Sequence, residues 1–163
     1  MLTAERLREL LHYDSDTGVF TWRVDRRGGR KAGDVTGARH GRGYVVIGID
    51  NKLYLAHRLA WLWMTGAWPE DKIDHMDLDR ANNRFANLRP ATESQNKANA
   101  PLRRDNTSGF KGVSWHSAVN RWAAQIHHNK RHYHLGLFDR PEEAHDAYVA
   151  AAERLFGEYA RAA

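Results

Sequence analysis

Apolar and polar positions alternate along the first part of the chain with two different periods. Three leucines recur at the spacing of one helix face, which predicts a helix over residues 4–11 with Thr3 as its N-cap. Strict alternation over residues 19–24 predicts a strand. Two further β-prone runs, residues 44–49 and 53–56, are separated by Asp-Asn-Lys and predict a hairpin.

The segments between and after these elements have their own composition. Residues 26–43 are rich in glycine and arginine and are expected to form a flexible basic loop. A helix is expected over residues 57–66, and Pro69 prevents its continuation. Residues 71–99 are polar and rich in asparagine, with little periodicity until their end, and residues 101–108 have the composition of a linker.

The last third of the chain predicts a small sheet covered by one helix. Strands are expected over residues 112–116, 121–128 and 132–138, joined by short polar turns. Pro141 suits the first turn of a helix that runs to Phe156 and carries an alanine-rich stripe on one face. Three strands and one helix can share a single core, so this segment is expected to fold as one domain.

Alternation along these strands predicts a sheet with two different faces. The apolar face collects side chains that can pack under the helix: Val113, Trp115, Trp122, Ala124, Ile126, Tyr133 and Leu135. The opposite face carries polar and basic side chains, the small Ala123 and no acid: Ser114, His116, Arg121, Gln125, His127, His132 and His134. The three aromatic residues of the first set are interpreted as core residues.

Charge favours a polyanionic partner. The 163 residues carry a formal net charge of +5, with a pI of about 9.7. Residues 23–58 contain nine lysines and arginines against three acids, and residues 101–138 contain six against one. One basic cluster is often only a solvated surface, but two clusters in a small chain point towards nucleic acid.

Several classes of protein are excluded by composition. The chain has no cysteine, so disulfides and cysteine-bound zinc are excluded. No apolar run approaches the roughly 20 residues that span a bilayer, and the first residues lead directly into a helical pattern. No membrane partner is therefore expected, and the expected location is the cytoplasm of a bacterium or of a phage-infected host.

The segment with the most candidate catalytic and metal-binding residues begins at Asp74-His75. Asn87 follows His75 by twelve residues within an Asn-Leu-Arg sequence, and Asn96 follows nine residues further on. Together with the lead-in at residues 55–59, this pattern resembles the HNH endonucleases of the phage and homing type that lack a zinc knuckle. The resemblance covers residues 44–99 and implies a ββα-metal fold that hydrolyses DNA phosphodiester bonds.

The resemblance also implies a role for each residue of the motif. Asp74 and the side-chain oxygen of Asn96 would ligate a divalent metal ion, and His75 would be the general base. Asn87 would brace the loop and orient His75. Many family members have a histidine where this chain has Asn96, and the exchange of nitrogen for oxygen should favour Mg²⁺ or Mn²⁺.

Other interpretations of the same segment stay open. Asp74, Asp77 and Asp79 could form a calcium loop, although the glycine and terminal glutamate of an EF-hand are missing. Asn82 and Asn83 are interpreted as turn formers, because asparagine side chains bond local backbone. His57 and Arg58 could contact phosphate or simply pack.

Residues 109–157 resemble the DNA-binding domain of plant ethylene-response factors, the APETALA/ERF type. The matching stretches are Gly112-Val113, Trp122-Ala123-Ala124-Gln125-Ile126, Leu135-Gly136-Leu137-Phe138, Glu142-Glu143-Ala144 and Ala147-Tyr148. In that family a three-stranded sheet lies in the major groove and the helix packs behind it. Histidine, serine and glutamine replace several of the family's DNA-facing arginines, so the preferred DNA sequence should differ.

DNA contacts are expected from both domains. The candidates are Arg58, Arg84, Lys111, Ser114, His116, Arg121, Gln125, His127, Lys130, Arg131, His132 and His134. A transition-metal site is the alternative for the histidine-rich strands, because His132 and His134 share a face. No carboxylate accompanies them, which favours the DNA-binding interpretation.

The sequence therefore predicts an α+β protein with an HNH endonuclease domain (residues 1–99), a linker (100–108) and an ERF-type domain (109–163). The expected function is metal-dependent cleavage of double-stranded DNA by a monomer. A DNA-binding regulator with a vestigial nuclease site is the alternative, and RNA binding is less favoured because exposed stacking aromatics are not expected.

Overall fold

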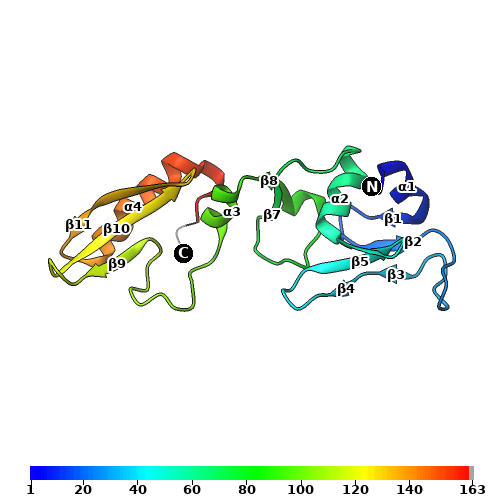
Figure 1. Cartoon of the computed structure of the whole chain (residues 1–163), viewed down its shortest axis with the longest axis horizontal. Coiled ribbons are helices and arrows are strands. Elements are labelled where there is room, and N and C mark those ends of the chain that lie inside the picture. The colour runs from blue at the N-terminus through cyan, green and yellow to red at the C-terminus, as the bar shows by residue number, and fades with distance from the viewer. Residues whose placement is uncertain (162–163) are drawn as a thin grey trace. The chain divides into compact units, whose positions relative to one another are not determined.

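Helices and antiparallel strands make up the computed structural model, which describes residues 1–161 (Figure 1). The chain divides into two compact units, Met1–Pro90 and Ala91–Ala163. Mixed helices and several small sheets confirm the α+β class predicted from the sequence.

The first unit begins with a helix that is followed immediately by a strand. Helix α1 (Ala4–Leu10) is capped by the Thr3 hydroxyl, as expected, but ends one residue early because Leu11 adopts extended backbone. Leu11 begins β1 (Leu11–Tyr13), which the sequence did not predict. The other strands of its sheet follow in the order β1-β2-β3: β2 (Phe20–Trp22) and β3 (Val35–Thr36).

A second sheet carries the predicted hairpin. Strands β5 (Val45–Ile49) and β6 (Lys52–Leu55) pair antiparallel, and β4 (Ala38–Arg39) pairs with β5. The turn residues between β5 and β6 have positive φ, as a tight hairpin requires. The basic segment 26–43 is therefore not one continuous loop, since β3 and β4 lie within it.

The core of the first unit lies between α1, α2 (Ala56–Thr65) and the strands that follow α1. Leucines from both helices meet tyrosine, phenylalanine and tryptophan from β1 and β2. Each fully buried side chain of this size stabilises the fold by roughly 1.5–3 kcal/mol. Helix α2 ends at Gly66, whose left-handed backbone (φ 80°) forms the C-cap.

The polar segment after α2 forms β7 (Lys72–His75), the short helix η1 (Phe85–Asn87) and β8 (Leu88–Ala91). Strands β7 and β8 make a two-stranded sheet. The long connection between them has no regular structure before η1.

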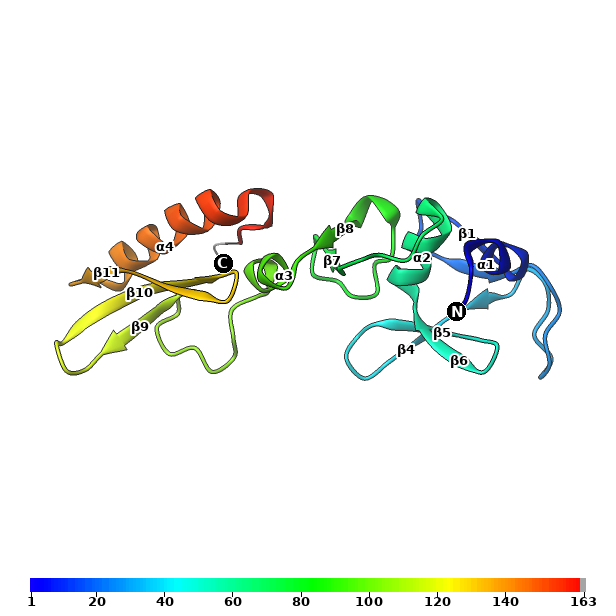
Figure 2. The same cartoon turned by 45° about the horizontal axis from the view of Figure 1, so that its top comes forward.

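The second unit contains a three-stranded antiparallel sheet with one long helix against one face (Figure 2). Its strands, in the order β11-β10-β9, are β9 (Val113–His116), β10 (Arg121–His128) and β11 (Arg131–Phe138). Helix α4 (Pro141–Phe156) continues into η2 (Gly157–Tyr159). All three strands and the helix were predicted within one residue at each end.

The alanine stripe of α4 packs on the face of the sheet that was predicted to be apolar. Ala124 and Ile126 are buried there, whereas Trp122 is only partly buried. Trp115 and Tyr133 are 48% and 38% exposed, so their assignment to the core was wrong. Trp115 pairs with Trp122 and Tyr133 with the buried Ile126, but both lie on the edge strands β9 and β11, where a side chain has a neighbouring strand on one side only.

The remaining helix, α3 (Glu93–Asn99), has a capping box in which Thr92 and Gln95 bond each other's backbone amides. This helix belongs to the second unit, where Ala98 packs with Ile126 and Tyr148. The boundary between the compact units is thus at Pro90, before α3, whereas the sequence suggested a domain boundary at Asn99.

Candidate active site

Asp74 and His75 occupy the last two positions of β7, and each is only 5% exposed. Ile73, which precedes them, belongs to the hydrophobic core, so the pair lies at the edge of that core. The chain then turns into the polar connection that leads to β8. Two adjacent ionisable side chains are therefore buried at a strand end, where loops can shape a site around them.

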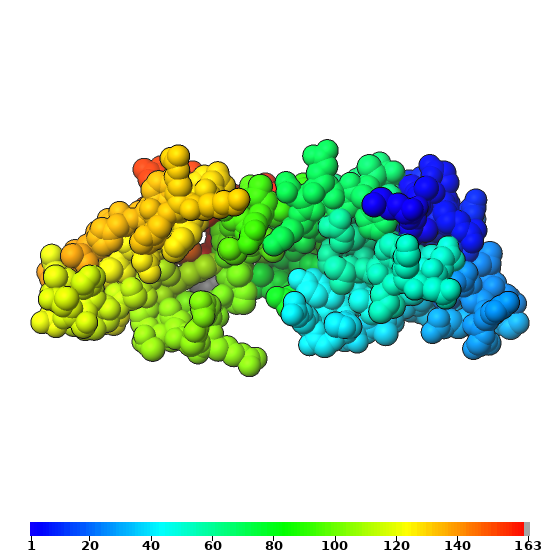
Figure 3. Space-filling view, in the orientation of Figure 1, coloured from blue at the N-terminus to red at the C-terminus, as the bar shows by residue number. Residues whose placement is uncertain are grey.

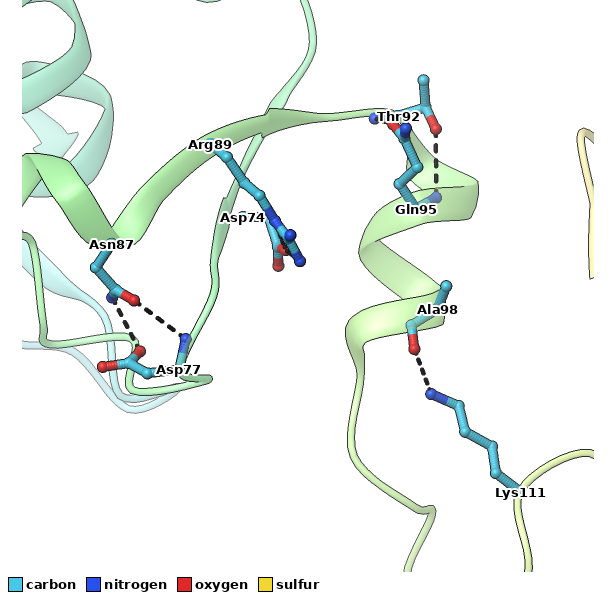
Figure 4. A network of polar contacts seen from close by, with 8 residues as sticks. All are labelled: Asp74, Asp77, Asn87, Arg89, Thr92, Gln95, Ala98 and Lys111. Carbon is cyan, nitrogen blue, oxygen red and sulfur yellow. Dashed lines mark hydrogen bonds and ion pairs between the residues drawn. The ribbon is translucent and has the colours of Figure 1, made fainter. Parts of the chain in front are cut away.

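The Asp74 carboxylate is held by Arg89 of β8. Arg89 Nε and Nη2 each lie 3.1 Å from Asp74 Oδ2, and the Arg89 side chain is 11% exposed (Figure 4). Charge-assisted hydrogen bonds of this kind orient a carboxylate strongly. The sequence motif includes Arg89, but this contact could not be inferred from it.

His75 is contacted by Asn83. Its Nε2 lies 3.4 Å from Asn83 Oδ1, while Asn83 Nδ2 donates to the Ala81 carbonyl at 3.1 Å. A backbone carbonyl can only accept, so the second bond fixes which end of the Asn83 amide faces His75. This arrangement favours the imidazole tautomer that carries its proton on Nε2.

Burial lowers the pKa of His75 below its ordinary value of 6.5, although Asn83 and the neighbouring carboxylates act in the opposite direction. The imidazole is consequently neutral near pH 7, with its basic lone pair on Nδ1. A neutral imidazole can accept a proton, which is what a general base must do.

Asn87 braces the loop that follows His75 (Figure 4). Its Nδ2 donates to Asp77 Oδ1 at 2.9 Å and to the Asn82 carbonyl at 3.0 Å, and its Oδ1 accepts from the Asp77 amide at 3.1 Å. Asn82 Nδ2 donates to the other Asp77 oxygen at 2.6 Å. Asn87 thus fixes the loop, and Asn83 is the asparagine that meets the His75 ring.

The same loop is supported from the β1–β2 hairpin. The Tyr13 hydroxyl donates to the Asn83 carbonyl at 2.6 Å, and the Phe85 amide donates to the Ser15 carbonyl at 3.0 Å. Gly18 (φ 75°) packs so closely that an added Cβ would lie 2.5 Å from Arg84 N. The N-terminal segment therefore supports Asn83 through contacts with its backbone.

Two aromatic rings flank His75. The His57 ring lies 4.9 Å away edge-on, and the Tyr44 ring lies 6.1 Å away. His57 is 4% exposed and its Nδ1 has no hydrogen-bond partner among the described residues. Burial, and then the charges of His75 and Arg58, lower the pKa of His57 to about 3. This geometry favours a packed, neutral His57 over a phosphate contact.

Arg58 is directed back onto the protein. Its guanidinium lies 5.8 Å from the centre of the Trp68 ring and reaches the carbonyls of Pro69 and Asp71 at 3.5 and 3.4 Å. Arg84 is exposed, and its hydrogen bonds within residues 1–161 are made by its backbone: the amide donates to Asn82 Oδ1 and the carbonyl accepts from the Asn87 amide. Of these two predicted DNA contacts, Arg84 has the more accessible side chain.

Asn96 lies on α3 in the second unit, whereas Asp74 lies in the first. The Asn96 side chain is half-buried and makes no hydrogen bond within residues 1–161. No group of three or more His, Asp or Glu residues in that range could hold a metal ion. Carboxylate and amide oxygens are by their chemistry ligands of hard cations such as Mg²⁺, which commonly takes its other ligands from water and phosphate.

The uncovered face of the second unit's sheet is polar, as predicted. Gln125 Oε1 lies 2.9 Å from His132 Nε2, and the rings of His127 and His132 stack at 4.6 Å. Arg121 pairs with the exposed Asp139 at 2.9 Å. The remaining predicted DNA contacts on the strands and the β10–β11 turn are exposed: Ser114, His116, Lys130, Arg131 and His134.

Lys111 has a different environment from the other predicted DNA contacts. Its Nζ donates to the Ala98 carbonyl at 2.5 Å, at the end of α3 (Figure 4), and to the Ala100 carbonyl at 2.7 Å. Burial lowers the pKa of Lys111 to about 8, and the charge of Arg161 adds to the effect. This geometry favours a structural role in capping α3.

Comparison with protein families agrees with this arrangement. A family model described as HNH endonuclease matches residues 54–98, which contain Asp74, His75, Asn87 and Asn96. An AP2 domain model matches residues 108–158. The two matches define the class of protein: an HNH nuclease domain followed by a DNA-binding domain of the ethylene-response-factor type.

Two viral proteins are similar over most of the chain. "Uncharacterized HNH endonuclease L560" of Acanthamoeba polyphaga mimivirus is 34% identical over 119 residues, 72% of this chain and 61% of that protein. "Protein 3.8" of Escherichia phage T7 is 30% identical over 106 residues, 64% of this chain and 87% of that protein. The chain belongs to the HNH endonuclease family. The aligned segment spans less than two thirds of the mimivirus relative.

Nucleases of this family generally depend on a divalent metal ion. Among the described residues, no helix is both long and apolar enough to cross a membrane.

Proposed function

We propose that this protein is a metal-dependent endonuclease that hydrolyses phosphodiester bonds of double-stranded DNA. The observation that carries the proposal is the adjacent pair at the end of β7: a neutral, buried imidazole beside a carboxylate held by an arginine. The family match over residues 54–98 supports it.

In this mechanism His75 removes the proton from the attacking water. The tautomer selected by Asn83 places the basic lone pair on Nδ1, which takes up that proton. Asn87 keeps the loop that carries Asn83 in place through Asp77 and Asn82. Attack on phosphorus then breaks the bond to the 3′ oxygen, leaving a 5′-phosphate and a 3′-hydroxyl.

Asp74 and Asn96 are the proposed ligands of the metal, with Mg²⁺ or Mn²⁺ as the preferred ion. The bound ion would supply positive charge against the phosphate oxygens and the leaving group. Arg89 orients the Asp74 carboxylate through its Nε and Nη2.

The second unit is the proposed DNA-holding domain. Its uncovered sheet face offers exposed histidine, serine and lysine side chains together with half-buried Arg121 and Gln125. A ribbon of this width fits the major groove. Linking it to the nuclease domain raises the local concentration of DNA at the active site. We further propose that the enzyme acts as a monomer in the cytoplasm of a bacterium or a phage-infected host.

The rival function is a DNA-binding regulator with a vestigial nuclease site. A plasmid-nicking assay with and without Mg²⁺ or Mn²⁺ distinguishes the two. The parent should nick only with metal, and His75→Ala should lose at least about 10²-fold in rate while still binding DNA. His12→Ala, an exposed histidine of β1, is the control. Metal-dependent nicking by His75→Ala at the parental rate would remove His75 from the mechanism, and no nicking by the parent would favour the regulator.

A further inference from the structure

We propose that Arg80, stacked on Tyr44, is a phosphate-binding group of the active site that grips the DNA backbone at or next to the cleaved bond. The proposal rests on the proposed function of His75. Arg80 lies in the irregular connection between β7 and β8 and was not among the residues that the sequence suggested as DNA contacts.

Tyr44 brings the β4–β5 loop (residues 40–44) to the catalytic histidine. Its ring lies 6.1 Å from the His75 ring and 5.3 Å from the His57 ring. The loop is closed by two short bonds, from the His40 amide to the Tyr44 carbonyl and from the Gly43 amide to the His40 carbonyl, both 2.7 Å. The loop lies on the surface (Figure 3, cyan), and residues 40–43 are exposed.

Arg80 is held against this loop in a defined position. Its guanidinium carbon lies 4.9 Å from the centre of the Tyr44 ring, and its Nη1 donates to the Arg42 carbonyl at 3.0 Å. The two ring distances place the guanidinium within about 11 Å of the His75 ring. At that distance Arg80 can contact either the phosphate that is attacked at His75 or the next phosphate along the strand.

The donors of Arg80 are available to a ligand. Only one of its five N–H groups has a partner within residues 1–161, and its side chain makes no ion pair there. Arg58 and Arg89, in contrast, direct their guanidinium groups onto carbonyls or Asp74. The contact with the Tyr44 ring and the bond to the Arg42 carbonyl restrain the position of the guanidinium, and its planar donor fork suits bidentate binding of phosphate.

DNA binding and cleavage should be measured on full-length variants. Arg80→Ala removes the group, Arg80→Lys keeps the charge without the planar fork, and Tyr44→Leu removes the stacking ring. Tyr44→Phe keeps the ring and is the conservative control. Arg27→Ala removes an exposed arginine of the basic segment and is the matched charge control.

Binding is measured first in a His75→Ala background, so that no DNA is cut. Arg80→Ala should weaken DNA binding about tenfold or more. It should also reduce the slope of log affinity against log salt by about one, as loss of one phosphate contact does. Arg80→Lys should restore the salt slope but only part of the affinity, and Tyr44→Leu should give an intermediate loss.

Cleavage is then measured with His75 present, under single-turnover conditions. Arg80→Ala should be slowed at subsaturating DNA, while Tyr44→Phe and Arg27→Ala stay within about twofold of the parent. Unchanged affinity, salt slope and rate in Arg80→Ala would overturn the proposal. An equal loss of DNA affinity in Arg80→Ala and Arg27→Ala would also overturn it, because the loss would then come from the lower net charge rather than from a specific contact. Absence of metal-dependent cleavage by the parent would instead overturn the proposed function, leaving the binding result to decide the role of Arg80.

Discussion

Asp77 and Asn87 bond each other in both directions across the loop that follows β7. Asn87 Nδ2 donates to the Asp77 carboxylate at 2.9 Å, and the Asp77 amide donates to Asn87 Oδ1 at 3.1 Å. Partial burial raises the pKa of Asp77, but hydrogen bonds from Asn82 and Asn87 outweigh it and lower the pKa below its ordinary 3.8. Asp77 therefore stays ionised as the anchor of the loop.

Replacement of Asn87 should loosen this loop. Asn87→Ala removes three hydrogen bonds, each worth about 1 kcal/mol, and should lower the cleavage rate at least tenfold with little change in DNA affinity. Single-turnover cleavage and fluorescence-based DNA binding measure the two effects. Asn82→Ala removes two side-chain hydrogen bonds, one donated to Asp77 and one accepted from the Arg84 amide, and should have a smaller effect. An Asn87→Ala enzyme as active as the parent would show that the loop needs no such brace.

A matched pair of glycine variants tests the support behind Asn83. Gly18 and Gly28 have similar positive φ angles, 75° and 84°, so alanine strains the backbone similarly at both. Only at position 18 would the new Cβ also meet backbone atoms of Asn83 and Arg84, at 2.5 Å. Gly18→Ala should therefore lose much more stability and cleavage activity than Gly28→Ala, as measured by thermal unfolding and nicking. Equal losses would mean that this close packing does not position the active-site loop.

His57 should make the stability of the first unit depend on pH. Its folded pKa of about 3 lies below its ordinary 6.5, so between these values the unfolded chain binds a proton that the folded chain does not. The stability contributed by neutral His57 is complete above pH 6.5. It is lost as the pH falls towards 3, with a slope approaching about 1.4 kcal/mol per pH unit.

Hydrogen exchange of α2 amides between pH 7 and pH 5 measures this dependence, with His57→Phe as the comparison. Phenylalanine keeps an aromatic ring beside Tyr44 and cannot be protonated, so the variant should lose less stability than the parent on acidification. Parallel losses in the two proteins would show that His57 is not the titrating group.

Neighbouring residues of β10 separate folding from DNA binding in the second unit. Ile126 is 2% exposed, and Ile126→Ala should destabilise the unit by roughly 2–5 kcal/mol. Gln125 lies on the uncovered face, and Gln125→Ala together with Arg121→Ala should weaken DNA binding without unfolding. Circular dichroism and DNA titrations at several salt concentrations measure both. If the double variant unfolds while Ile126→Ala remains folded and loses DNA binding, the two faces have been assigned the wrong way round.

The sequence by itself determined the periodic elements and the identity of the chemistry. Helices α1, α2 and α4 and the strands of the second unit follow from spacing, because one face of each is buried and burial imposes a period. Asp74, His75, Asn87 and Asn96 were recognised because their types and spacing are those of a phosphodiester-cleaving motif. Such local signals need no knowledge of distant contacts.

Only the tertiary structure decided which residues surround that motif. Arg89 on Asp74, Asn83 on His75 and Tyr44 under Arg80 join separate segments of the chain, and the sequence has no period that brings them together. The partial exposure of Trp115 has the same cause, since alternation assigns a face but not how far the helix covers it. Side-chain burial and hydrogen-bond pairing are properties of the packed chain, whereas element type and residue chemistry can be read locally.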